Sequence, residues 1–245
     1  MLKLKHVMAL LLLGALGLTL ASWWNRDAFS DPLPWDPALA EPPRQVPVER
    51  DAFLAGANGV DYRIQPLYRY ELTGLVVSFK RFKPGIGIHE RWNDYINVAD
   101  LCVVWGDNAN ELDLNEFDFW NLEFTCMVRT DDLATWNRFD QDALANNHLL
   151  TTDPAVQTVI DELRVGDIVY LSGHLAEYGQ PGGHVRGTST TRTDRGNGAC
   201  ETIHVDHAQI LASMHNGWRT RFRLGLGLLV ALLIAWFAIP HRYLR

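Results

Sequence analysis

Apolar residues are concentrated in two stretches near the ends of the chain. Residues 7–24 and 224–239 contain no charged side chain, and neither keeps the polar face that a core helix of a soluble domain usually shows. As a helix, the first stretch is about 27 Å long, which is close to the thickness of a bilayer core. The pattern predicts two transmembrane helices, within residues 1–24 and 224–240.

The first stretch has a second interpretation, a cleaved signal peptide. Thr19, Leu20 and Ala21 have the small-x-small pattern of a signal-peptidase site. Trp23 and Trp24 follow directly, and tryptophan is enriched where a transmembrane helix meets the membrane surface. These two tryptophans favour an anchor that stays in the membrane, and the signal peptide is the alternative.

Basic residues near the two expected spans bear on their orientation. Lys3 and Lys5 precede the first span, and the tail of residues 241–245 carries two arginines. Lysine and arginine are enriched on the cytoplasmic side, and the first span usually dominates the orientation. We therefore expect the central domain on the periplasmic side of a bacterial inner membrane. The basic juxtamembrane segment 213–223 favours the opposite orientation.

Prolines are dense after the first span. Six of the eleven prolines fall within residues 25–48. Proline lacks a backbone N–H and blocks both helices and strand ladders. We therefore predict a Pro-rich extended tether over residues 25–66.

From residue 67 onward, apolar and polar positions alternate with the period of two that is typical of strands. The alternation predicts strands over residues 68–79, 100–105, 117–128, 168–176 and 201–211. Gly74 marks an expected bend or bulge in the first of them. Two helices are expected, one over residues 139–150 and one after Asp153, which suits an N-cap before Pro154.

The order of these elements indicates the fold class. A helix between the third and fourth of five strands is the arrangement of the OB-fold. We predict a mainly β domain over residues 67–212, a five-stranded OB-like Greek-key barrel flanked by the two transmembrane helices. A β-sandwich or an unrelated small barrel is the alternative.

Composition and motifs argue against several classes of function and do not identify one. The net charge of −7 argues against a general nucleic-acid binder, which usually has a basic face. The chain contains no P-loop, GxGxxG, GxSxG or HExxH motif, which argues against the common enzyme classes. His204 and His207 do not have a zinc-site pattern, and we expect neither a metal nor a cofactor.

Two polar segments are the candidate binding site. In an OB-like barrel, the loops after the first strand and before the fifth flank the binding face. Here these are residues 80–98 and the Gly-broken stretch 187–205, in which residues 196–198 are expected to form a tight turn with positive φ angles. The candidate ligand-binding residues are Arg81, Lys83, His89, Arg91, Trp92, Arg186, Thr190, Arg192, Asp194 and Arg195.

These side chains combine positive charge with aromatic rings. Such a set can hold an anionic polymer, a carboxylate-bearing glycan or a peptide terminus. The alternative is that they are solvated loop charges, which are common on protein surfaces.

Three cysteines permit one disulfide and leave one thiol over. Outside the cytoplasm a disulfide is favoured, with Cys126–Cys200 as the first candidate and Cys102–Cys126 as the second. Buried free thiols are the main alternative. A third possibility is that Cys200 is a nucleophile, but His204 lies four residues along the same strand, about 13 Å away.

Three segments resemble a known group of proteins. Residues 188–205, 124–126 and 146–150 are similar to an uncharacterised group of bacterial membrane-anchored proteins with an OB-like barrel domain. This resemblance implies the placement and the fold, and it implies no activity.

The sequence therefore favours a tethered binding or assembly module over an enzyme. Its expected partners are the lipid bilayer and another envelope protein or an anionic glycan, and no nucleic acid. One alternative is a cell-envelope enzyme that uses Cys200 as a thiol nucleophile. The other is a cytoplasm-facing barrel that binds nucleic acid.

Overall fold

The computed structural model describes residues 4–83, 85–194 and 199–239 and divides the chain into two compact units. One unit comprises residues 1–31 and 215–245, and the other comprises residues 32–214. The first contains two long apolar terminal helices and the second a large mixed sheet, so the chain is mainly β outside its ends.

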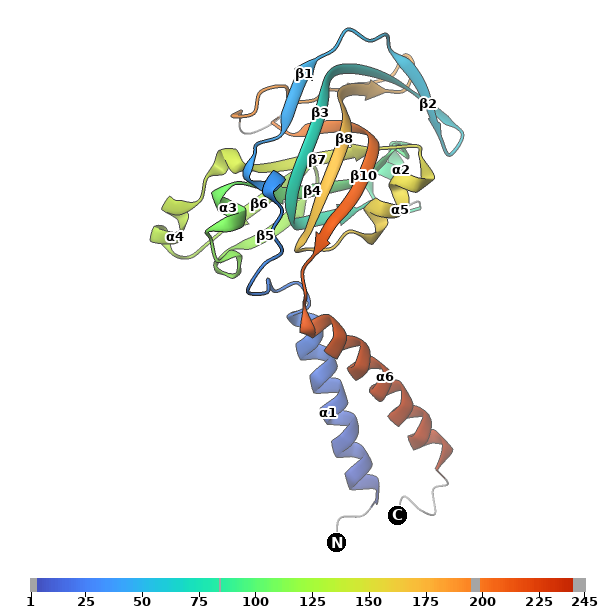
Figure 1. Ribbon diagram of the computed structural model, residues 1–245. Helices are drawn as coiled ribbons and strands as arrows, with labels where there is room; N and C mark the ends of the chain where they lie inside the picture. Colours follow the sequence, from blue (N-terminus) through green and yellow to red (C-terminus); the bar gives the residue numbers. More distant parts are fainter. Residues whose placement is uncertain (1–3, 84, 195–198, 240–245) are drawn as a thin grey trace. The chain divides into compact units, whose positions relative to one another are not determined.

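The helical unit is an antiparallel pair of helices, α1 (Leu4–Trp24) and α6 (Gly217–Ala238) (Figure 1). Both are long and apolar enough to cross a membrane. Small residues lie where they meet: a Cβ at Gly225 would come within 2.8 Å of the Thr19 hydroxyl oxygen. Close approach through small side chains is how helices pack in lipid, where apolar surface gains little by association.

Hydrogen bonds join the two helices of this unit at one end. The side-chain amide of Asn216, the N-cap of α6, donates to the carbonyl oxygens of Arg26 and Ala28 at 2.9 Å. Arg219 donates to the Arg26 carbonyl and lies 3.4 Å from Asp27. The pair is therefore held by polar contacts at one end and by close packing where Gly225 meets Thr19.

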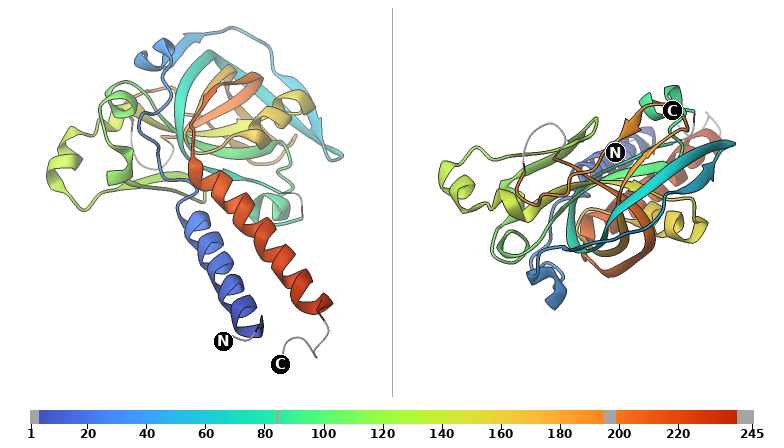
Figure 2. Two further views of the ribbon diagram at one scale, coloured as in Figure 1. Left: turned by 60° about the horizontal axis from the view of Figure 1, so that its bottom comes forward. Right: turned by 90° about the horizontal axis from the view of Figure 1, so that it is seen from above.

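Eight strands of the described part of residues 32–214 form one mixed sheet. They are β1 (Arg44–Pro47), β2 (Phe53–Ala57), β3 (Val60–Arg81), β4 (Asn97–Val104), β7 (Leu144–Leu150), β8 (Asp167–Gly179), β9 (Val185–Arg186) and β10 (Glu201–Ser213). Strand β3 pairs with β4, β4 with β7, β7 with β10, β10 with β8, and β8 with β3 again. Only the β7–β10 pair among these is parallel. The sheet is strongly curved (Figure 2).

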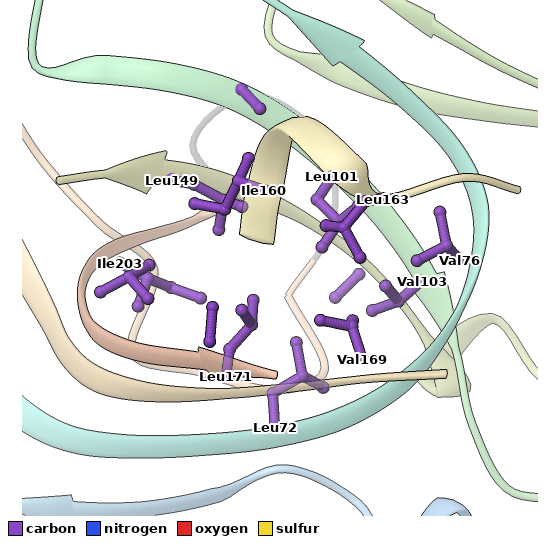
Figure 3. Close-up of a cluster of buried hydrophobic side chains, with 14 of the residues drawn as sticks. Leu72, Val76, Leu101, Val103, Leu149, Ile160, Leu163, Val169, Leu171 and Ile203 are labelled. Atoms are coloured by element: carbon purple, nitrogen blue, oxygen red, sulfur yellow. The ribbon is translucent and has the colours of Figure 1, made fainter. Parts of the chain in front are cut away.

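The main core lies on one face of this sheet, under helix α5 (Pro154–Glu162). The Asp153 side chain accepts a hydrogen bond from the Ala155 N–H at 2.8 Å, which confirms the expected N-cap. Ile160 and Leu163 point from this segment toward Leu101 and the other apolar side chains of the sheet (Figure 3). The helix thus covers core residues that the alternation of the strands directs inward.

Strand β3 is longer than the sequence predicts, and its bulge is elsewhere. The pairing with β4 shifts register between Val76 and Ser78, not at Gly74. Gly74 serves close packing instead, because a Cβ there would lie 2.7 Å from the Cβ of Val103.

The prediction of a single strand over residues 117–128 is wrong. This segment is a hairpin of β5 (Asp118–Leu122) and β6 (Thr125–Arg129), which forms a separate two-stranded sheet. Phe124 has a φ of +63° and turns the chain. The alternation continues across that turn, so the sequence pattern does not reveal it.

Short helical segments flank the hairpin: α3 (Asp107–Asn110), η2 (Leu114–Glu116) and α4 (Leu133–Arg138). The hairpin and α4 extend on the side of the sheet away from α5 (Figure 2).

The prediction of a helix over residues 139–150 is also wrong. A short turn, η3 (Gln141–Ala143), is followed by strand β7. Apolar residues at Phe139, Ala143 and Leu144 have helical spacing, but β4 and β10 pair with this segment on both sides. Tertiary pairing therefore overrides the local pattern.

The segment expected to be a tether contains structure. After η1 (Pro37–Ala40), strands β1 and β2 both pair with β3, which itself begins at Val60. Pro47 ends β1, and Pro66 lies at a register shift of β3. The prolines are accommodated at an edge and at a bulge, which are the positions that tolerate a missing N–H.

Gly173 gives a stability test of the β8–β10 crossing. A Cβ at this position would overlap the carbonyl oxygen of His204. We expect Gly173→Ala to lower the free energy of unfolding by about 1–3 kcal/mol, measured by denaturant titration of the full chain in detergent. Gly187→Ala is the matched control, because nothing lies within 4 Å of its added Cβ. Equal stability of the two variants would contradict the close approach.

Candidate functional site

A cleft of about 660 Å³ lies in the sheet unit. This volume is typical of small-molecule sites. Its walls come from β3, the loop after β3, the turn of the β5–β6 hairpin, and the segment from the end of β8 through β9. The lining residues are Tyr62, Trp92, Asp94, Phe124, Tyr178, Gly179, Gln180, Gly183, His184 and Arg186.

Phe124 is the central aromatic residue of this cleft. Its ring stacks on Trp92 with a centroid distance of 5.8 Å and an interplanar angle of 7°. The guanidinium carbon of Arg186 lies 4.1 Å from the centre of the same ring. His89 and His148 contact it edge-on. One residue of the hairpin therefore contacts both the loop after β3 and Arg186 of β9.

A row of side chains on the face of the sheet away from the main core holds the hairpin. Ser78, Cys102 and Asn146 are register partners on β3, β4 and β7, so they point to the same side. Cys102 forms a disulfide with Cys126 of β6. Asn121 of β5 accepts from the Ser78 hydroxyl at 2.6 Å and donates to the Asn146 side-chain oxygen at 3.3 Å.

The expected Cys126–Cys200 disulfide is therefore wrong, and the second candidate, Cys102–Cys126, forms instead. The sequence pattern places Cys126 in the middle of one long strand. In the structure this segment is a hairpin, which brings Cys126 over β4. Cys200 is left as the free cysteine.

The Cys200 thiol is held by hydrogen bonds and is partly buried. It donates to the Phe124 carbonyl oxygen at 3.3 Å and accepts from the Asn146 side-chain amide at 3.5 Å. Burial raises the pKa of this thiol, so the reactive thiolate is disfavoured. Neither partner is a base, and this geometry favours a structural thiol over a nucleophile.

Behind Arg186, a buried pair of side chains fixes its position. His148 Nδ1 lies 2.5 Å from Asp100 Oδ1, and His148 Nε2 lies 3.1 Å from Arg186 Nη2. A guanidinium can only donate, so Nε2 accepts from Arg186 and Nδ1–H donates to Asp100. The side chains of His148 and Asp100 are 3% and 0% exposed. The chain Asp100–His148–Arg186 therefore orients the one cation that lines the cleft among the described residues.

A second buried pair lies at the other wall. Asp94 Oδ2 accepts from Tyr178 Oη at 2.9 Å and lies 2.8 Å from His89 Nδ1. Burial, followed by the negative charge of Asp94, raises the pKa of Tyr178, so its hydroxyl remains a donor. The other carboxylate oxygen of Asp94 is buried and has no hydrogen-bond partner.

Of the candidate ligand-binding residues that the structure describes, Trp92 and Arg186 line the cleft, and His89 packs directly behind it. Arg81 instead donates to the Leu163 carbonyl near the end of α5, while Lys83 and Arg91 are solvent-exposed.

The other candidates lie after β9. The Thr190 carbonyl accepts from Gln45, and Asp194 accepts from Ser189. Arg195 and the expected turn at 196–198 lie outside the described residues.

Arg192 holds this segment to the sheet. It lies 2.6 Å from Glu201 Oε1 and donates to the Tyr70 hydroxyl at 2.9 Å. Burial raises the pKa of Glu201 to about 7, against the opposing effect of Arg192. Residues 187–194 are thus largely occupied by internal contacts.

The HVDH motif, residues 204–207, also has an internal role. Asp206 lies 3.1 Å from His174 and 3.2 Å from His204, and the hydrogen bonds and charges of these histidines lower its pKa although burial alone would raise it. Within the described part of the chain, no three such side chains form a group that could hold a metal. The motif ties β10 to β8.

Sequence reasoning missed Tyr62, Asp94, Phe124 and Tyr178. Tyr62 lies in the expected tether, Phe124 in an expected strand, and Tyr178 just after the strand expected over residues 168–176. Asp94 lies among basic loop residues, and nothing in the sequence distinguishes it from an ordinary solvated charge. The density of aromatic residues was the one available signal, and it does not say which of them meet.

The raised pKa of Glu201 predicts a pH dependence of stability. Its ordinary value is 4.5, so between about pH 4.5 and pH 7 the folded state holds a proton that the unfolded state has released. This stabilisation is complete below pH 4.5 and is lost as the pH rises through 7, by roughly 3 kcal/mol. We expect the stability of the wild type relative to Glu201→Gln to fall as the pH rises from about 5 to 8, measured by denaturant unfolding. A pH-independent difference would contradict the assignment.

Comparison of the chain with protein-family models, with curated proteins and with solved structures found no match.

Proposed function

We propose that this protein is a membrane-anchored binding module in which an OB-like five-stranded barrel presents the cleft to a ligand. The observation that carries the proposal is the cleft itself, whose aromatic walls come from several separate segments of the chain. Its polar groups are engaged in buried contacts that position side chains, which is typical of recognition sites.

The strand pairing supports the barrel. The five strands β3, β4, β7, β8 and β10 pair in a cycle that returns to β3, and α5 lies between the third and fourth of them in the chain. This is the element order of an OB-fold. Strands β1, β2 and β9 and the β5–β6 hairpin are additions to that pattern.

The position of the cleft supports a binding role. Trp92 and Asp94 belong to the loop after the first barrel strand, and Gln180 and Arg186 belong to the connection before the fifth. These two loops are the usual ligand loops of OB-folds. Phe124, from the inserted hairpin, adds a wall that the simple fold lacks.

The disulfide supports a periplasmic orientation of the sheet unit. Disulfides persist in oxidising compartments and are rare in the cytosol. Together with two helices able to span a membrane, Cys102–Cys126 favours a sheet unit on the periplasmic side of a bacterial inner membrane. The ligand is then an envelope component, such as a glycan or a segment of another envelope protein.

Binding of a planar probe tests the cleft. We expect 6-fluoro-2-naphthamide, which is uncharged, to bind the full chain in phosphatidylcholine nanodiscs, detected by ¹⁹F line broadening above that of empty nanodiscs. Trp92→Ala should weaken this binding by roughly tenfold, because it removes a stacking surface. Trp35→Ala is the matched control, since Trp35 is also exposed but does not line the cleft. Absence of specific binding, or equal loss in both variants, would contradict the proposed function.

The redox state of the cysteines tests the orientation. After acid quenching of expressing cells and alkylation without reduction, we expect one alkylated cysteine, Cys200, by mass spectrometry. Reduction before alkylation should release Cys102 and Cys126 as well. Cys126→Ser should expose Cys102 as a second free thiol without reduction. Alkylation of all three wild-type cysteines without reduction would argue for a cytoplasmic domain.

A further inference from the structure

We propose that the ligand of this cleft carries a carboxylate, and that Arg186 is its anchor. The inference rests on the proposed binding function and adds the chemical class of the ligand. It separates Arg186 from the other basic residues of the two loops, because Arg186 is the one arginine or lysine among the described residues that lines the cleft.

Arg186 has N–H donors without a hydrogen-bond partner among the described residues. A guanidinium has five N–H donors, and the hydrogen bond found for Arg186 is the one to His148 Nε2. Within the described residues, no carboxylate lies at ion-pair distance from it, whereas Arg192 is paired with Glu201. No nitrogen of Arg186 is both buried and without a partner, so its remaining donors face the solvent of the cleft. An anion in the cleft would complete its contacts.

The guanidinium is already oriented for such a partner. His148 and Asp100 hold one edge of it, and the ring of Phe124 supports its face at 4.1 Å. Ordering a flexible side chain on binding lowers the affinity for a ligand. Arg186 is already held in place in the folded protein, so binding does not incur that loss. The planar fork of arginine matches the two oxygens of a carboxylate.

The surrounding charges favour a monoanion. Asp94 lines the cleft, and Asp100 lies behind Arg186 through His148. A doubly charged phosphate would meet two nearby carboxylates with a single cation to compensate. A carboxylate brings one negative charge, which Arg186 can neutralise.

The remaining walls define the body that bears this carboxylate. Trp92 and Phe124 are stacked and nearly parallel, and the buried rings of Tyr62 and Tyr178 complete an apolar lining. A flat or ring-shaped body next to the carboxylate fits this surface, as in a uronic acid or an aromatic acid.

The test compares two probes of the same shape. The carboxylate 6-fluoro-2-naphthoate and the neutral 6-fluoro-2-naphthamide are titrated by ¹⁹F NMR into the full chain in phosphatidylcholine nanodiscs, with empty nanodiscs as the blank. We expect the naphthoate to bind about tenfold more tightly than the naphthamide. In Arg186→Gln this ratio should fall to about one. Arg69→Gln is the matched control, because Arg69 is 60% exposed and lies outside the cleft, and it should keep the ratio.

The outcomes separate the two proposals. If both probes bind equally and Trp92→Ala weakens both, the carboxylate inference is overturned and the binding cleft stands. If the preference for naphthoate persists in Arg186→Gln, Arg186 is not the anchor and the inference is overturned. If neither probe binds the wild type, the proposed function fails together with the inference. Denaturant unfolding of Arg186→Gln beside the wild type shows whether the variant is folded.

Discussion

The Cys102–Cys126 disulfide joins the β5–β6 hairpin to strand β4, and the cleft depends on that bond. An isolated two-stranded hairpin is marginally stable in water, and this one also carries Phe124 at a positive φ. Closing a loop of this length stabilises a fold by about 3 kcal/mol in the chain-entropy model. The hydrogen bonds of Asn121 to Ser78 and Asn146 then set the hairpin's position on the sheet. These contacts hold the hairpin where its Phe124 ring lines the cleft.

Buried charges have a similar effect on the loops around the cleft. Asp94 accepts from Tyr178 of β8 and holds the loop after β3, and Arg192 pairs with Glu201 of β10 and holds the segment before it. Asp100 and His148, on β4 and β7, hold Arg186 of β9. Removing one partner of such a pair leaves a buried charge uncompensated, so each contact specifies its geometry strongly. The result is a set of loops that are positioned before any ligand arrives.

The sequence was informative where the determinants were local. The strands around residues 168–176 and 201–211 and the helix after Asp153 were predicted from alternation and capping, and they are present. The third of the five expected strands was misassigned, because residues 117–128 alternate like a strand and residues 144–150 do not. The sequence predicts five strands, and one of the five is predicted over the wrong residues. Neither the turn at Phe124 nor the disulfide it permits has a local signal.

The residues of the candidate site, too, were predictable from sequence only where their determinants are local. Charge and glycine content directed attention to residues 187–205, yet Thr190, Arg192 and Asp194 are engaged in contacts that hold this segment in place. What makes Arg186 different is its set of partners. Asp100, His148 and Phe124 come from β4, β7 and the hairpin turn, and no spacing rule connects them. A polar side chain that folding leaves incompletely satisfied is available to a ligand, and which one remains so is decided by packing between distant segments.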